Sequence, residues 1–134
     1  MERRRFPFVW GAVVALGLSA PVLAHHSFAA EFDADKPVTV KGVITSVRLE
    51  NPHSWFFLDV AGSDGKVEKW AFEASTPSSL IRSGFKPGTV KAGDEVTIKG
   101  YHARDASANA GAARELQMAD GRAFAVGPQV GPVR

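Results

Sequence analysis

Two runs of alternating apolar residues, at 53–60 and 67–74, limit this chain to a β-rich fold. Alternation with a period of two puts one side of each strand in a core and the other side outside it. In the first run, the core side consists of Phe56, Leu58 and Val60. Ser63-Asp64-Gly65, between the runs, is typical of a hairpin turn. The sequence therefore predicts an antiparallel pair of strands in the middle of the chain.

An earlier strand is predicted to open at Pro37 and to bend. Its first apolar residues are Val38, Val40 and Ile44. Gly42 interrupts the alternation, which continues on the other parity at Val43, Val47 and Leu49. A glycine inside a strand is typical of a bulge or a sharp bend. Asn51-Pro52 then marks a turn before the hairpin.

A short helix is predicted at residues 77–83, directly after the hairpin. Thr76 fits the N-cap, Pro77 the first helical position, and Gly84 the position just past the end. Leu80 and Ile81 are expected to pack inward from this helix.

Further strands are predicted at residues 95–103, 114–118 and 122–126. Residues 105–113 are rich in Ala, Ser, Asn and Gly, and they are expected to form a mobile loop. Residues 127–134 hold two prolines and two glycines, and they are expected to be a disordered tail.

The order of these elements predicts a mostly β fold, a small OB-like antiparallel barrel of five or six strands with one short helix. In that architecture the first strand is long and bent at a glycine, and a helix closes the gap between the third and fourth strands. An open antiparallel sheet with one helix is the alternative. We expect one domain at residues 37–126, with residues 25–36 as an N-terminal arm.

Residues 1–24 are predicted to be a secretory signal peptide. Three arginines at positions 3–5 precede an apolar run, and Val22 and Ala24 are small residues at the −3 and −1 positions of a cleavage site. Cleavage after Ala24 gives a periplasmic or secreted protein that begins at His25. An uncleaved membrane anchor is the competing interpretation, but an apolar run of about 13 to 18 residues is shorter than the roughly 20 that span a bilayer. No stable membrane anchor is therefore expected after cleavage.

The mature chain is expected to carry no net charge. Residues 1–24 hold three of the 16 Lys and Arg residues and one of the 14 Asp and Glu residues. A neutral exported chain does not favour nucleic-acid binding. Cysteine is absent, so disulfides and thiolate ligands are excluded.

Five motifs between residues 25 and 97 carry a resemblance to known sequences. They are His25-His26-Ser27-Phe28-Ala29-Ala30-Glu31-Phe32-Asp33, Lys41-Gly42-Val43-Ile44, Asn51-Pro52-His53, Trp70-Ala71-Phe72-Glu73 and Gly93-Asp94-Glu95-Val96-Thr97. Together they resemble a family of small exported bacterial proteins of unknown function. The resemblance implies export and a shared β-rich fold. It implies no activity and no binding residues.

An amino-terminal His25 is a candidate bidentate copper ligand. In a histidine brace, the terminal amine and the first imidazole bind copper together with a second histidine. Neutral imidazole and amine nitrogens suit Cu(II), and both groups lose their protons near neutral pH. The further ligand is predicted to be His26, His53 or His102. His26 also offers a chelate that needs no fold, because its imidazole, its amide and the amine can bind copper in a square plane.

The same histidines have ordinary structural interpretations. The two at the start can be a polar beginning of the chain, His53 can cap a turn, and His102 can be an ordinary strand-end residue. The sequence has no cysteine partner and no HExxH pattern, so a hydrolytic zinc site is not favoured.

Trp55 and Phe57 are predicted on the side of their strand opposite the core, where they form a candidate face for a ligand or partner. OB barrels often bind along strands two and three. In the alternative interpretation the N-terminal arm covers the pair, with Phe28 and Phe32 packed on it, because exposed aromatic patches are uncommon.

The sequence contains no enzyme signature, since it has no GxSxG or SxxK serine motif and no glycine-rich phosphate loop. We expect an exported small β-barrel binding or accessory protein, with copper binding through His25 as the sharper hypothesis. The alternative is a metal-independent periplasmic module that binds a protein or a small ligand through its aromatic face. A copper-dependent redox enzyme is a third hypothesis.

Overall fold

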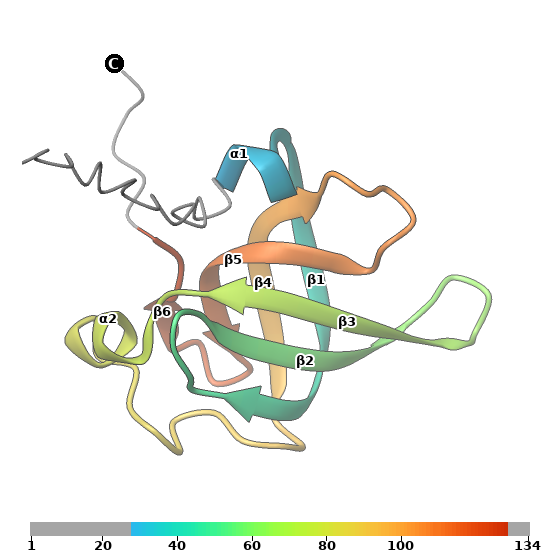
Figure 1. Cartoon of the computed structure of the whole chain (residues 1–134). Coiled ribbons are helices and arrows are strands. Elements are labelled where there is room, and N and C mark those ends of the chain that lie inside the picture. Colours follow the sequence, from blue (N-terminus) through green and yellow to red (C-terminus); the bar gives the residue numbers. More distant parts are fainter. Residues whose placement is uncertain (1–27, 129–134) are drawn as a thin grey trace, which may run out of the picture.

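Six strands form one sheet, and an additional pairing between the first and fifth strands in its order makes five of them a closed ring. The computed structural model describes residues 28–128, and it contains α1 (Phe28–Glu31), β1 (Phe32–Arg48), β2 (Ser54–Ala61), β3 (Val67–Ala74), α2 (Pro77–Arg82), β4 (Glu95–Ala103), β5 (Ala110–Met118) and β6 (Ala123–Ala125). The strand order is β3-β2-β1-β4-β5-β6, and β3 also pairs with β5. In Figure 1, β2 and β3 cross in front of β1 and β4. The predicted signal peptide, His25, His26 and residues 129–134 lie outside the described residues.

Closure of the ring depends on one short parallel pairing between β3 and β5. Ala71 pairs with Ala110, and Glu73 pairs with Ala112, whereas the other neighbouring strands run antiparallel. The predicted OB-like class is confirmed as a mostly β fold with α2 between the third and fourth strands. The ring replaces the open sheet that was the alternative.

The first strand is longer than predicted, and its irregularity lies elsewhere. β1 begins at Phe32, which pairs with Ala103, so the strand starts five residues before Pro37. The β1–β2 register shifts between Ile44 and Ser46, so the bulge is not at Gly42. A Cβ atom on Gly42 would lie 2.6 Å from the Asp59 carbonyl oxygen, and glycine is therefore needed for the close approach of β1 and β2.

The core fills the ring with the apolar residues that the alternation predicted. Phe56, Leu58 and Phe72 are buried, and Phe85 packs edge-on against Phe56 from the segment after α2. The apolar side of β1 changes after Ile44 and not at Gly42, so Val43, ahead of the bulge, is 42% exposed. The expectation that Ile81 packs inward was wrong, because α2 presents only Leu80 to the core and Ile81 is 50% exposed.

The capping prediction for α2 is confirmed. The Thr76 hydroxyl accepts a hydrogen bond from the Ser79 backbone N–H, and the helix ends at Arg82, one residue before the predicted limit. Gly84 follows with a φ of 92°, a left-handed conformation that favours glycine. None of the helices within residues 28–128 is long and apolar enough to cross a membrane.

The fifth strand begins inside the segment that was predicted to be a loop. β5 starts at Ala110, and Gly111, Ala112 and Ala113 are buried. A Cβ atom on Gly111 would lie 2.8 Å from the Phe72 ring and 2.5 Å from the Tyr101 carbonyl oxygen. Small residues thus reflect crowding where the ring closes and do not reflect a mobile loop. The predicted last strand, at residues 122–126, is shorter and spans Ala123–Ala125.

Candidate functional site

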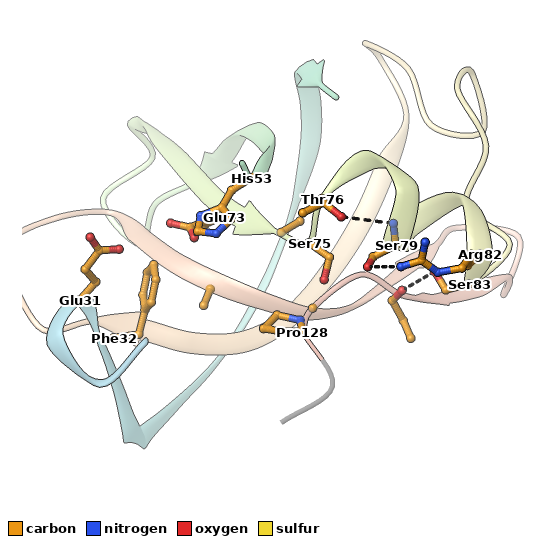
Figure 2. Close-up of a pocket in the computed structure, with 14 residues that line it drawn as sticks. Glu31, Phe32, His53, Glu73, Ser75, Thr76, Ser79, Arg82, Ser83 and Pro128 are labelled. Atoms are coloured by element: carbon orange, nitrogen blue, oxygen red, sulfur yellow. Dashed lines mark hydrogen bonds and ion pairs between the residues drawn. The ribbon is translucent and has the colours of Figure 1, made fainter. Parts of the chain in front are cut away.

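A pocket of about 640 Å³ lies between α1, the ends of β3 and β5, α2 and the segment that follows β6 (Figure 2). Its apolar lining includes Phe32, Ala74, Ala112 and Pro128. Phe32, Ala74 and Ala112 are themselves buried. A cavity of this size is in the range of small-molecule sites, which makes it the main candidate site in the described part of the chain.

One end of the pocket is acidic. Glu31, His53 and Glu73 line it, and the Glu73 carboxylate contacts Nδ1 of His53. The Glu73 side chain is only 14% exposed, whereas that of His53 is 48% exposed. Burial raises the pKa of Glu73 above its ordinary value, the His53 charge lowers it, and the nearby Glu31 charge raises it further. The site therefore holds a glutamate whose side chain is mostly shielded from water, with a second carboxylate nearby.

Strand register places Glu73 at this end. Its neighbours Phe72 and Ala74 face the core, so the Glu73 side chain projects on the other side of β3. His53 directly precedes Ser54, which pairs with Ala74, and this brings the imidazole next to Glu73. The Glu31 carbonyl accepts a hydrogen bond of 2.9 Å from the Arg104 backbone N–H, which ties α1 to the end of β4.

The opposite end of the pocket is basic and rich in hydroxyl groups. Arg82 donates a hydrogen bond of 3.0 Å from Nη2 to Ser79 Oγ. Ser83 Oγ lies 2.8 Å from the Leu80 carbonyl oxygen and 2.9 Å from that of Ala125, so it joins α2 to β6. Figure 2 shows Arg82 and Ser83 at one side of the pocket and Glu31 and Glu73 at the other.

The two described histidines lie in different surroundings. His53 lines the pocket, whereas His102 packs edge-on against Trp70, with 5.6 Å between ring centroids. His102 Nδ1 is 2.7 Å from the Ala103 carbonyl oxygen. Within residues 28–128 the structure brings together no group of three His, Asp or Glu side chains that could hold a metal ion. Because His25 and His26 lie outside those residues, the copper site at His25, with His26, His53 or His102 as the further ligand, stays a prediction.

The predicted aromatic face is present on β2. The Trp55 and Phe57 rings are stacked, with centroids 6.4 Å apart and an interplanar angle of 23°. The Arg48 guanidinium lies 5.0 Å from the centroid of the Phe57 ring. Phe32, which was expected to cover this pair, lines the pocket beside Glu31. The face is therefore an Arg–Phe–Trp stack on the outer side of β1 and β2.

Sequence reasoning identified His53 but not the groups around it. The hairpin pairs Trp55 with Glu73, so the turn at residues 63–65 already implied that His53 and Glu73 are close. No such signal existed for Glu31 and Arg82. They lie on α1 and α2, and only the tertiary fold brings these two helices to the pocket.

A model of one protein family matches residues 12–113, and it is described as a family of unknown function, DUF6152. This chain belongs to DUF6152. The match confirms the expectation of a family of uncharacterised function. Among curated proteins, none matches the DUF6152 chain.

One solved structure that resembles the DUF6152 chain is the crystal structure of a complex of TiaS with tRNA and ATP. The two sequences are 19% identical and superpose with a TM-score of 0.44. The alignment covers 61% of this chain and 18% of the other, so this chain spans less than a fifth of that protein.

Proposed function

We propose that this chain is an exported binding or accessory protein that binds copper through the amino terminus created at His25, with His53 as the further ligand. The observation that carries this proposal is the place of His53. It lines the same pocket as Glu31, which ends the first described helix, α1.

Chain length supports a meeting of His25 and His53. Phe28, where α1 begins, is only three residues after His25, and three residues reach at most about 10 Å. Cleavage after Ala24 would thus leave the new amino group within about 10 Å of Phe28, which begins the one-turn helix that ends at the pocket residue Glu31. His26 has the same reach, and its fold-independent chelate is the main competitor.

The contact between His53 and Glu73 fits a copper ligand. A carboxylate at Nδ1 favours the tautomer with the proton on Nδ1, which leaves the Nε2 lone pair free. Histidines that bind metals commonly donate their other N–H to a carboxylate or a backbone carbonyl in this way. Bound copper would supply a Lewis acid and a one-electron couple, and His53 would hold it at the acidic end of the pocket.

His102 is the weaker choice for the further ligand. Its Nδ1 also meets an acceptor, but its ring packs against Trp70 and it does not line the pocket with Glu31. His102 therefore serves as the matched control for His53.

The test begins with the exported protein, whose amino terminus is identified by mass. Cu(II) is then titrated into that protein, into a form with one alanine before His25, and into the variants His53→Ala and His102→Ala. The extended form and His53→Ala should bind copper at least about tenfold more weakly, as expected for a lost ligand, and His102→Ala should bind as the parent does. Equal affinity in the parent and the extended form would reject the brace.

The alternative function is a metal-independent interaction through the aromatic stack. The stacking of Trp55 on Phe57, with Arg48 over the Phe57 ring, favours it, because aromatic and arginine side chains dominate protein contact sites. A periplasmic partner retained by the parent should be lost from both Trp55→Ala and Phe57→Ala. Val67→Ala, which changes an exposed apolar residue of the hairpin, is the control. Retention by all variants would count against this face.

A further inference from the structure

We propose that the pocket between α1 and α2 binds a short peptide with a free amino end and a free carboxyl end. This inference goes beyond copper binding and does not require it. It rests on the separation of charge along the pocket, on its volume, and on the small side chains that line its middle.

The acidic end suits the amino group of the peptide. Glu31 and Glu73 place two carboxylates at this end, together with the imidazole of His53. The Glu73 carboxylate is mostly shielded from water, so a cation that reaches it is attracted more strongly than at an open surface. An ammonium group supplies the charge and three N–H donors, which can be shared between both carboxylates.

The opposite end suits the carboxylate of the peptide. Arg82 has five N–H donors in a fork that matches a carboxylate, and one of them is used on the Ser79 hydroxyl. Ser75 also lines the pocket, and its hydroxyl group is a further donor.

The middle of the pocket suits a peptide backbone. Ala74 and Ala112 have small side chains that leave room for it, and Pro128 gives it an apolar wall. A volume of about 640 Å³ is larger than a single amino acid fills, and pockets of this size bury drug-sized ligands. In Figure 2, Pro128 lies between the two charged ends, so one ligand must pass it to meet both. A peptide of a few residues meets these conditions.

The test uses the mature chain after copper has been removed with a chelator. Trialanine, trialanine acetylated at its amino end and trialanine amidated at its carboxyl end are titrated by calorimetry. Each blocked peptide should bind about tenfold more weakly than trialanine, because each lacks the charge that one end of the pocket recognises. Equal binding of the three peptides, or binding of none, would overturn the proposal.

Two variants assign the ends of the peptide to the ends of the pocket. Glu73→Gln should prefer trialanine over its acetylated form less strongly than the parent does, because only Glu31 then remains as a carboxylate at that end, and it should still distinguish the amidated form. Arg82→Gln should show the reverse pattern. Arg122→Gln, which removes a surface arginine paired with Asp120, is the matched control and should distinguish all three peptides as the parent does. A Glu73→Gln variant that prefers trialanine over its acetylated form as strongly as the parent does would contradict the assignment.

A chain that ends at Pro128 tests a different occupant. If trialanine bound this shortened chain but not the full mature chain, the carboxyl-terminal residues of the protein would fill the pocket, and the proposal would be wrong. Equal binding to both chains supports it. Because the protein holds no copper in these titrations, failure of the copper proposal would leave a positive peptide result intact, and failure of peptide binding would leave the copper titration intact.

Discussion

His53 and His102 make the same kind of contact in two opposite settings. Each holds Nδ1 against an oxygen acceptor, Glu73 for His53 and the Ala103 carbonyl for His102. The first lines a pocket among charged groups, whereas the second closes against Trp70, which stacks on the core residue Phe72. The comparison teaches that a local hydrogen bond does not decide what a histidine does. Its packing neighbours decide whether the free nitrogen is available to a ligand.

The largest expected effect is a difference in the free energy of unfolding between a variant of the core and a variant of the pocket wall. Phe72→Ala should lower the free energy of unfolding by about 3–5 kcal/mol, because it opens a cavity in a closed core. Phe32→Ala should cost less, since the Phe32 ring already borders an open pocket. Urea denaturation of both variants measures the difference, and equal losses would mean that the pocket wall belongs to the core.

A second effect concerns the β3–β5 pairing that closes the ring next to His102. Gly111 pairs with His102 on β4 and with Phe72 on β3, and an added Cβ atom would meet the Phe72 ring. Gly111→Ala should therefore destabilise the protein by about 1–3 kcal/mol, the usual cost of overpacking. Val67→Ala, at an exposed hairpin position, should change stability by less than about 0.5 kcal/mol. A Gly111→Ala protein as stable as the parent would show that β3 and β5 can move apart to accommodate the added Cβ atom.

A third effect is the pH dependence of the stability that Glu73, in the pocket, contributes to the protein. Burial raises the pKa of Glu73 in the folded protein, so folding favours the protonated carboxyl. The stability that this group contributes is present below its ordinary pKa and is lost as the pH rises through the raised pKa. In metal-free protein, the Tm of the parent minus that of Glu73→Gln should fall as the pH rises from about 4 to 8. A difference that grows with pH would mean that the contact with His53 outweighs burial.

The smallest expected effect lies on the aromatic face, away from both histidines. Arg48→Ala removes a guanidinium from the Phe57 ring and should cost about 0.5–1 kcal/mol, as exposed cation–π contacts do. Chemical denaturation of the variant beside the parent measures this. A loss several times larger would show that Arg48 supports the strand pairing as well as the ring.

Regular alternation made the middle of the chain predictable. The bounds of β3 and β4 are those predicted, and α2 was found from Thr76, Pro77 and Gly84 because capping is local chemistry. The start of β5 was missed because Ala110 and Gly111 have a loop-like composition, and only closure of the ring makes them a strand. The start of β1 was missed because its pairing with β4 is distant in sequence.

The candidate site was predictable only in part, because some of its residues come together only through contacts that are distant in sequence. His53 was singled out by residue type, and its neighbour Glu73 follows from hairpin register. Arg82 and Glu31 reach the pocket through two helices whose positions depend on tertiary contacts, such as the hydrogen bond from the Arg104 backbone to the Glu31 carbonyl.

The pocket walls come from both ends of the described chain, α1 at residue 28 and the segment that reaches Pro128. Between them, Val126 is fully buried in the core, so the segment that carries Pro128 is anchored to the ring of strands. The pocket is therefore complete only when the segments around Glu31 and Pro128 are both packed against that ring. Ligand binding by this protein should report that both segments are in place.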